Sequence, residues 1–209
     1  FATVMTYFQG VNPMMLVQQI IGGVQPISLI AVPMFIFAAD IMTSGQIAER
    51  LLNFVVKFVG HKRGGLPIAT TTACTLFGAV SGSTQATVVA IGGPLRPLLL
   101  KAGYSSSFST ALIINAAVIA LLIPPSVYMI VYGVVGACSV GDLFIAGVGP
   151  GLLLCLLFCV YCWFKSGAEH ASVEASRAEK RLAFRRALLS FSFPVIIFGG
   201  IYSGIFSPT

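Results

Sequence analysis

The sequence predicts an all-α polytopic membrane protein, and three observations lead to this prediction. Hydrophobic residues make up 57% of the 209 positions and charged residues only 9%, against roughly 25% charged residues in a soluble domain. Residues 66–95, 102–141 and 143–164 contain no Asp, Glu, Lys or Arg, and each stretch exceeds the roughly 20 apolar residues that cross a bilayer as a helix. Small polar residues interrupt the first stretch and paired prolines interrupt the second, which predicts a re-entrant helical hairpin and a broken helix.

The charged residues between these stretches predict the orientation of the chain. Basic residues gather at three places, which are Lys57–Arg63, Arg96–Lys101 and Lys165–Arg186. Short basic loops beside spans mark the cytoplasmic side of a membrane, so the net charge of +6 is interpreted as a topology signal. We expect the lipid bilayer as a partner and no nucleic acid, because the basic residues flank spans and do not line an aromatic groove.

Residues 1–63 are expected to hold one or more N-terminal spans and an arm helix. The segment Gln25–Ser44 is a span candidate with a single charge, Asp40, near one end. After Gly45, residues 46–61 show apolar side chains at helical spacing and polar ones on the other side. A helix of that length is only about 24 Å long, so it suits a position in the membrane interface or against a neighbouring helix. A short tilted span is the alternative.

Residues 64–101 form the predicted hairpin. Basic residues stand at both ends of this segment, so both ends are expected on the cytoplasmic side and the chain has to enter the membrane and return. Non-helical backbone at membrane depth persists only where protein or a watery cavity satisfies it, so the polar turn is expected to line a site. One long kinked span is the alternative. In the hairpin reading, residues 66–80 descend, Ser81, Gly82, Ser83 and Thr84 form the tip, and residues 85–100 return.

Residues 102–141 form the predicted broken helix, interrupted at "IPPS", Ile123–Ser126. The two prolines remove backbone donors and release preceding carbonyls from helical hydrogen bonds. Paired interruptions near the bilayer midplane are how secondary transporters build binding sites. Freed carbonyls and hydroxyls suit sodium, and helix N-termini suit a carboxylate. Asn115, two turns before the break, is either a ligand or the donor of a structural hydrogen bond between helices.

The rest of the chain continues the alternation of spans and loops. We expect a transmembrane helix over 142–165, a cytoplasmic basic loop over 166–187 and a further transmembrane helix over 188–209. The chain begins without Met and stops directly after a span, so it is expected to be a piece of a larger protein. Three cysteines at C-x-x-x-C-x-x-C spacing fall within an uninterrupted apolar helix and are interpreted as inert packing residues.

Seven motifs in a fixed order carry a family resemblance. They cover the chain from about residue 25 to 209, and they read "IAVPMFIFAADIM", "VGHKRGG", "GAVSGSTQATVVAIG", "KAGY", "IPPSVYMIVYG", "LFIAGVGPGLLL" and "PVIIFGGIYSGIFSPT". In this order they resemble the large membrane subunit of TRAP transporters, the tripartite ATP-independent periplasmic type.

The resemblance implies an elevator-type secondary transporter of the bacterial inner membrane, coupled to Na⁺, of which this chain holds one of two inverted repeats. It also implies a small membrane subunit and a periplasmic substrate-binding protein that delivers organic acids. A single half is not expected to transport alone. By similarity, sodium lies near Ser81, Ser83 and the backbone of 120–126, and the ion and substrate site includes Ser81, Gly82, Ser83, Thr84, Thr87, Asn115, Ile123, Pro124, Pro125 and Ser126.

Three positions depart from the pattern of the family. Thr87 stands where many relatives carry an acid, which favours a sialic-acid-type acidic sugar over a C4-dicarboxylate as substrate. Ala120 stands where a glycine often precedes the break. Arg96 lies where relatives tend to be apolar, and it either reaches lipid phosphate or pairs within the protein.

Two other classes of protein remain as alternatives. A channel with a re-entrant pore loop would need a narrow pore or oligomer symmetry. An intramembrane enzyme could use Ser81 as nucleophile, but a base is then needed within reach. Both histidines, His61 and His170, lie in the charged flanks, so we expect that the chain is not an enzyme.

Overall fold

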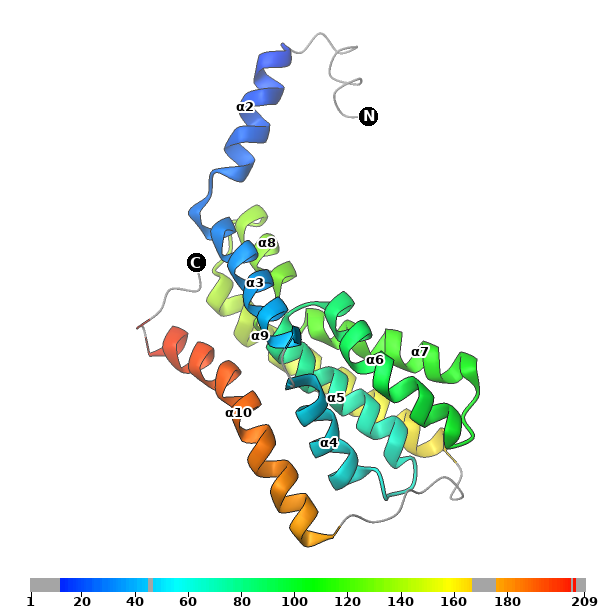
Figure 1. Ribbon diagram of the computed structural model, residues 1–209. Helices are drawn as coiled ribbons and strands as arrows, with labels where there is room; N and C mark the ends of the chain where they lie inside the picture. The colour runs from blue at the N-terminus through cyan, green and yellow to red at the C-terminus, as the bar shows by residue number, and fades with distance from the viewer. Residues whose placement is uncertain (1–11, 45–46, 167–175, 204, 206–209) are drawn as a thin grey trace.

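The fold was analysed in a computed structural model that describes residues 12–44, 47–166, 176–203 and 205. These residues form helices and turns, and no strand occurs among them, which confirms the all-α prediction. Most of the helices form one bundle, and α2 (Pro13–Val24) stands away from it at one end (Figure 1). Asn12 caps α2, since its side chain accepts the backbone N–H of Met14 at 2.9 Å, and Pro13 follows at the position where a missing N–H costs nothing.

The segment expected as the span Gln25–Ser44 consists of two helices. A 3-10 turn, η1 (Ile27–Ile30), leads into α3 (Ala31–Ser44). With 14 residues, α3 is about 21 Å long, shorter than the roughly 30 Å hydrocarbon core of a bilayer, and the predicted span stays a prediction. Its side chains Met34, Phe37 and Ile41 are exposed.

The next helix, α4 (Ile47–Val59), is strongly amphipathic. Ala48, Leu51, Leu52 and Val55 are buried, and the helix contacts α5 and α10. One face of α4 thus packs against neighbouring helices, and the position of α4 relative to a membrane stays a prediction.

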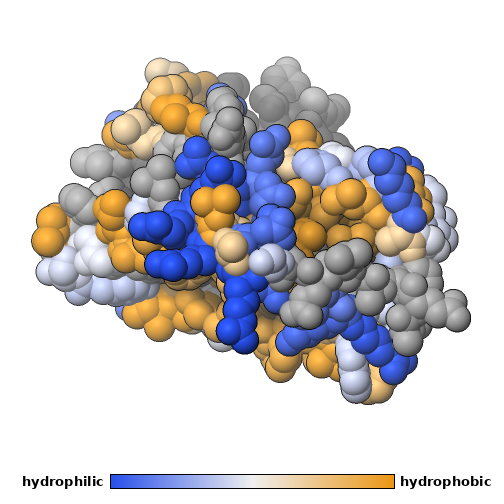
Figure 2. Space-filling view, turned by 60° about the horizontal axis from the view of Figure 1, so that its bottom comes forward, coloured by the Kyte–Doolittle hydropathy of each residue, from blue (hydrophilic) through white to orange (hydrophobic). Residues whose placement is uncertain are grey.

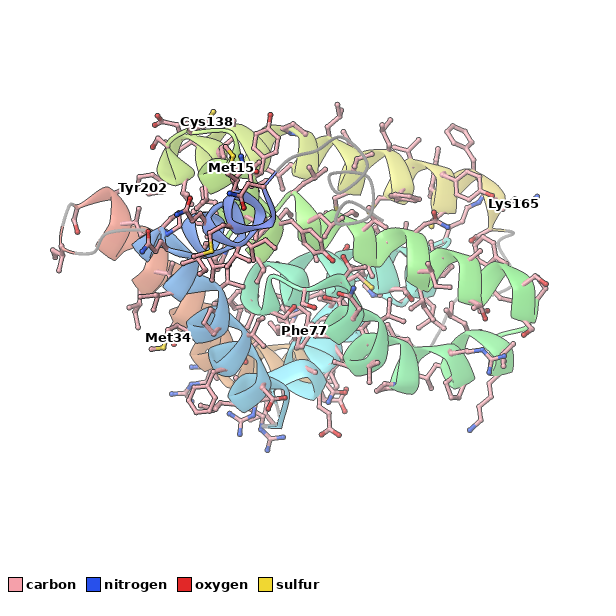
Figure 3. All side chains as sticks on the ribbon, turned by 90° about the horizontal axis from the view of Figure 1, so that it is seen from above. Met15, Met34, Phe77, Cys138, Lys165 and Tyr202 are labelled. Atoms are coloured by element: carbon pink, nitrogen blue, oxygen red, sulfur yellow. The ribbon has the colours of Figure 1, made fainter. Side chains whose placement is uncertain are left out.

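Two antiparallel helices, α5 (Gly65–Ser81) and α6 (Thr84–Lys101), form the predicted hairpin within one residue of the expected bounds. The core of the molecule lies around α5, where Phe77 is fully buried, while Met34 and Tyr202 lie at the periphery (Figure 3). Threonine hydroxyls inside α5 are satisfied locally, because Thr70 and Thr75 each donate to the carbonyl four residues earlier, as hydroxyls in apolar helices commonly do. Whether the hairpin is re-entrant in a bilayer stays a prediction.

The predicted break in the following helix is present. The chain runs through α7 (Ser106–Ala117) and a 3-10 turn, η2 (Val118–Leu121), leaves helical structure at Leu122–Ser126, and resumes as α8 (Val127–Val135). The two prolines lie inside this non-helical segment, as expected from the donors that they lack.

Two long helices complete the fold. α9 (Val140–Lys165) has 26 residues and, within the described residues, is the one continuous helix long and apolar enough to cross a membrane. α10 (Arg177–Tyr202) is bent by 42° between its parts Arg177–Leu188 and Ser190–Tyr202, and it passes the same test only when both parts are taken together. The part Arg177–Leu188 lies mostly in the segment 166–187, which the sequence predicts to be a loop. From Arg177 on this prediction is wrong, because the segment is helical. A charged capping group explains the difference, because the Glu179 carboxylate accepts the N–H of Ser176 at 3.1 Å and so starts the helix.

Candidate functional site

The tip of the hairpin is a two-residue turn between helix ends. Gly82 ends α5 in the left-handed conformation, with φ of 61°, and its N–H donates to the carbonyl of Gly78 at 2.8 Å. Ser83 then begins α6 in extended conformation, and its side chain accepts the N–H of Ala86 at 3.4 Å. The C-terminal end of one helix and the N-terminal end of the next thus meet at one point, with opposite partial charges.

The hairpin tip touches the proline break through backbone atoms. A Cβ added to Gly82 would overlap the carbonyl oxygen of Pro125, and one added to Gly78 would lie 2.6 Å from the Cβ of Ala120. Both contacts would be closer than real Cβ atoms allow. Glycine is therefore needed at both positions for α5 and its tip to approach the segment from Ala120 to Pro125 this closely. The structure therefore joins two segments that the sequence analysis connected only by analogy.

Three hydroxyl-bearing residues hold the turn in shape. The hydroxyls of Ser81 and Thr87 lie 3.2 Å apart, and Thr87 donates to the carbonyl of Ser83 at 2.8 Å. Ser81 is 4% exposed and Thr87 fully buried. Thr87 therefore lies behind the tip and supports it, and its expected place in the binding site stays a prediction.

The break itself is held by α9. Ile123, Pro124, Pro125 and Ser126 are all buried. A Cβ on Gly151 of α9 would lie 2.7 Å from the side chain of Ile123, and one on Gly147 would overlap the carbonyl oxygen of Leu122. Small residues four apart on α9 thus let the non-helical segment approach the helix closely, as in other membrane helix contacts.

Two hydroxyls at this junction have no partner within the described part of the chain. They are the Oγ of Ser126, which is fully buried, and the Oγ1 of Thr84, whose atom is buried. A buried hydroxyl without a hydrogen bond costs about 1–3 kcal/mol, so the native state needs a reason to keep both. Hydroxyl and carbonyl oxygens are the ligands that a hard cation takes. Among the described residues, no group of three or more His, Cys, Asp or Glu could hold a metal ion.

A groove of about 390 Å³ runs beside the tip. From the hairpin it is lined by Ser81, Ser83 and Ala86, and from α3 by Pro33, Ile36, Phe37 and Asp40. Asp40 and Phe37 were not among the expected site residues. The sequence carried a signal for Asp40, because a single acid inside an apolar segment is commonly functional.

Asn115 lies away from the tip. Its side-chain amide donates to the carbonyl of Ala111 at 2.8 Å, within its own helix, and it lines a separate pocket between α7 and α9. The structure thus brings together the tip and the break but shows Asn115 neither as a ligand there nor as the donor of a bond between helices. At the rim of the junction, Gln85 of α6 donates to the hydroxyl of Tyr128 of α8 at 3.4 Å, a contact that spans both interruptions.

The amino-acid sequence matches a known protein family. Residues 1–209 match the family described as "Tripartite ATP-independent periplasmic transporter, DctM component". Relatives named as large permease proteins of TRAP transporters include an ectoine protein of Halomonas elongata, 60% identical, and an ectoine/5-hydroxyectoine protein of Ruegeria pomeroyi, 62% identical. In each case the alignment covers 93% of this chain and 46% of the relative. A C4-dicarboxylate protein of Pseudomonas aeruginosa is 44% identical, over 87% of this chain and 43% of the relative.

These matches confirm the resemblance that the motifs carried, and they are named as transporter permeases, which agrees with the expectation that the chain is not an enzyme. The chain spans about half the length of the curated relatives that it matches. The match over residues 1–209 shows that the chain belongs to the DctM component family of the TRAP transporters.

Proposed function

We propose that the chain forms one half of a sodium-coupled secondary transporter subunit, and that its hairpin tip and proline break together bind Na⁺. The main support is the pair of buried hydroxyls without partners, Ser126 Oγ and Thr84 Oγ1, on the two sides of this junction. The Ser81 hydroxyl and the carbonyls of Ser83 and Pro125 add further oxygens close by. These neutral oxygens can replace the water of a monovalent cation without leaving a buried net negative charge behind.

In this proposal the hairpin is re-entrant and moves as one body with the broken helix. The contact of Gly82 with Pro125 and the packing of Gly147 and Gly151 against the break leave little room for relative motion inside this unit. An elevator mechanism, in which the unit carries ion and substrate across the membrane, uses such rigidity. A small membrane subunit and a periplasmic binding protein are the proposed partners in the bacterial inner membrane, together with the half of the permease that the chain does not cover.

For the substrate we propose a small organic carboxylate, with ectoine as the first candidate. Two relatives at 60% and 62% identity are named for ectoine. Ectoine is a cyclic zwitterion, with a carboxylate and a delocalised positive charge. The groove beside the tip offers the carboxylate of Asp40 and the ring of Phe37, which attract a cation, next to the N-terminal end of α6, which attracts a carboxylate. A sialic-acid-type sugar or a C4-dicarboxylate is then the second choice, since Thr87 lies behind the tip and its identity does not shape the groove.

The test is uptake into proteoliposomes by the full-length subunit with its small partner and binding protein. Labelled ectoine, sialic acid and succinate are supplied in turn, with and without an inward sodium gradient. We expect sodium-driven accumulation of one of them, and a Ser126→Ala variant that needs a several-fold higher sodium concentration for half-maximal uptake.

Ser109→Ala is the matched control. Ser109 is as fully buried as Ser126, but its hydroxyl already donates to the Ser105 carbonyl at 3.0 Å within α7. Equal sodium dependence in wild type and Ser126→Ala would contradict the ion site. Accumulation without any effect of sodium would contradict the coupling.

A further inference from the structure

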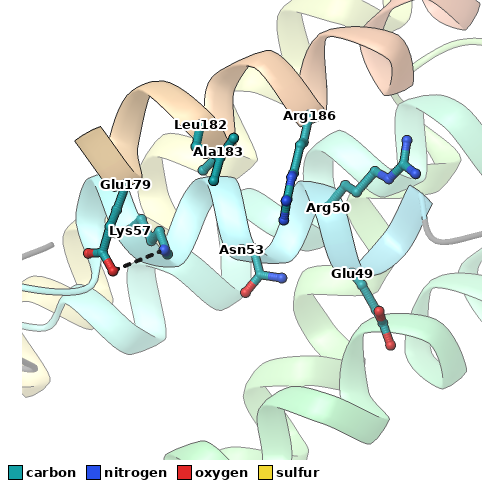
Figure 4. Close-up of a pocket in the computed structure, with 8 residues that line it drawn as sticks. All are labelled: Glu49, Arg50, Asn53, Lys57, Glu179, Leu182, Ala183 and Arg186. Carbon is teal, nitrogen blue, oxygen red and sulfur yellow. Dashed lines mark ion pairs between the residues drawn. The ribbon is translucent and has the colours of Figure 1, made fainter. Parts of the chain in front are cut away.

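A polar cavity separate from the groove at the tip lies between α4 and the first part of α10. It measures about 530 Å³, and its walls bear both signs of charge. One ion pair crosses it, because Lys57 Nζ lies 3.7 Å from Glu179 Oε1. Figure 4 shows Arg186 reaching from α10 toward Asn53 of α4. The groove is lined by Glu49, Arg50, Asn53, Lys57, Glu179, Leu182, Ala183 and Arg186.

The two helices carry an excess of positive charge, and the lining of the groove itself has the basic residues Arg50, Lys57 and Arg186 against two acids. Glu49 and Glu179 are their acids, and Glu179 is already paired with Lys57. Arg186 makes no hydrogen bond or ion pair within the described part of the chain, so its guanidinium is available to an anion. The basic residues on the same two helices are seven of the twelve in the sequence, namely Arg50, Lys57, Arg177, Lys180, Arg181, Arg185 and Arg186.

Large apolar side chains lie among these charges. Leu182, Phe184 and Leu188 are each about half exposed on the first part of α10, and Leu182 lines the groove itself. Figure 2, in which the lower end of Figure 1 faces the viewer, shows hydrophilic side chains gathered in the middle of this end and hydrophobic ones beside them. Basic and apolar residues alternate in this way on helices that lie among lipid headgroups, and the apolar part of α10 follows directly.

We propose that this groove binds the headgroup of an anionic phospholipid. The guanidinium of Arg186 holds the phosphate, Arg50 on the facing helix contributes a second positive charge, and Asn53 and Glu49 offer polar partners to headgroup hydroxyls. Leu182 at the wall gives the start of the acyl chains an apolar contact. An acidic protein segment is less suited, because half-exposed leucine and phenylalanine side chains border the cations.

The test uses the purified full-length protein and phosphatidylglycerol, with bound lipids counted by native mass spectrometry during a titration against a phosphatidylcholine background. In the Arg186→Gln variant we expect affinity for phosphatidylglycerol to fall about tenfold, the loss of one charge-assisted contact. Arg186→Lys keeps the charge and is expected to keep most of the binding. Unfolding midpoints of all variants are compared, so that a folding defect is recognised.

Arg181→Gln is the matched control, because Arg181 lies on the same helix, is exposed and does not line the groove. It is expected to change the affinity less than about twofold, since an exposed charge outside the site acts only through screened attraction. Equal losses in the two glutamine variants would mean a diffuse surface effect and would overturn the proposal. So would displacement of the lipid by millimolar inorganic phosphate, or loss of the small subunit from Arg186→Gln with lipid binding unchanged.

Discussion

Replacing Gly82 by alanine tests the contact on which the candidate site depends. The residue has φ of 61°, a conformation that costs an L-residue with a Cβ about 1–2 kcal/mol. The new Cβ also overlaps the carbonyl oxygen of Pro125, and overpacking of a rigid contact costs about 1–3 kcal/mol more. We therefore expect Gly82→Ala to destabilise the junction by roughly 2–5 kcal/mol and to push the tip away from the break.

Substitutions at two other glycines separate the cost of the left-handed backbone from the cost of the overlapping Cβ. Gly78→Ala keeps a helical backbone but places its Cβ 2.6 Å from that of Ala120, so it carries the overlap alone and should cost about 1–3 kcal/mol. Gly93, in the middle of α6, has nothing within 4 Å of its Cβ position. Gly93→Ala should therefore leave stability unchanged or raise it by about 0.5–1 kcal/mol.

The assay is the midpoint of thermal unfolding of the full-length subunit in detergent, followed by sodium-driven uptake of each variant. From the most to the least stable, the expected order is Gly93→Ala, wild type, Gly78→Ala and Gly82→Ala. Uptake is expected to be lost in Gly82→Ala. If Gly82→Ala unfolds and transports like Gly93→Ala, the tip does not press on the Pro125 carbonyl, and the tip and the break do not form one site.

Three further predictions concern side chains at or near the junction. Ser81→Ala should raise the sodium concentration for half-maximal uptake about three- to tenfold, the loss of a neutral oxygen contact. Ser83→Ala keeps the carbonyl that the proposal assigns to the ion but removes the cap of α6, so it should cost about 0.5–2 kcal/mol of stability and weaken sodium activation through the displaced tip. Unchanged sodium activation in both variants would remove these residues from the site. Pro124→Ala combined with Pro125→Ala should lower the initial uptake rate, because a continuous helix can then form across the break, and full activity would show that other contacts maintain it. Asn115→Ala should leave sodium dependence unaltered, since its amide is bonded within its own helix, and a shift would place it at the ion.

The hairpin and the break were predictable because each rests on residues with unusual backbone properties. Gly82 takes a left-handed conformation and Ser83 caps the next helix, so the turn could be located to within one residue. Pro124 and Pro125 lack backbone donors, which fixes the place where helical hydrogen bonding stops. These are local effects that a sequence displays directly.

The sequence did not predict the features that depend on packing between helices. It also led to one wrong prediction, because the charge of the basic segment was given more weight than its helix propensity. The basic segment after residue 176 was expected as a loop, although Lys, Arg, Glu and Ala favour helices and Ser176 with Glu179 has the spacing of a capping box. Asp40 was noted only as the charge of a span, because nothing in the sequence shows that α3 lies beside the hairpin tip. The contact of α9 with the break likewise depends on two glycines, Gly147 and Gly151, whose partners are distant in the chain.

The tip and the break touch through main-chain atoms, at a glycine that has no side chain to place between them. The contact therefore does not depend on the side chains that line the neighbouring groove. Substitutions at groove positions such as Phe37 and Asp40 can alter what binds beside the tip without moving Gly82 or the Pro125 carbonyl. Under the proposed function, selection acts on cargo recognition through exchangeable groove side chains, while the backbone contact between Gly82 and the Pro125 carbonyl is kept. A transporter with the proposed site would acquire new substrates through a few exposed replacements without disturbing the junction that the proposal assigns to sodium.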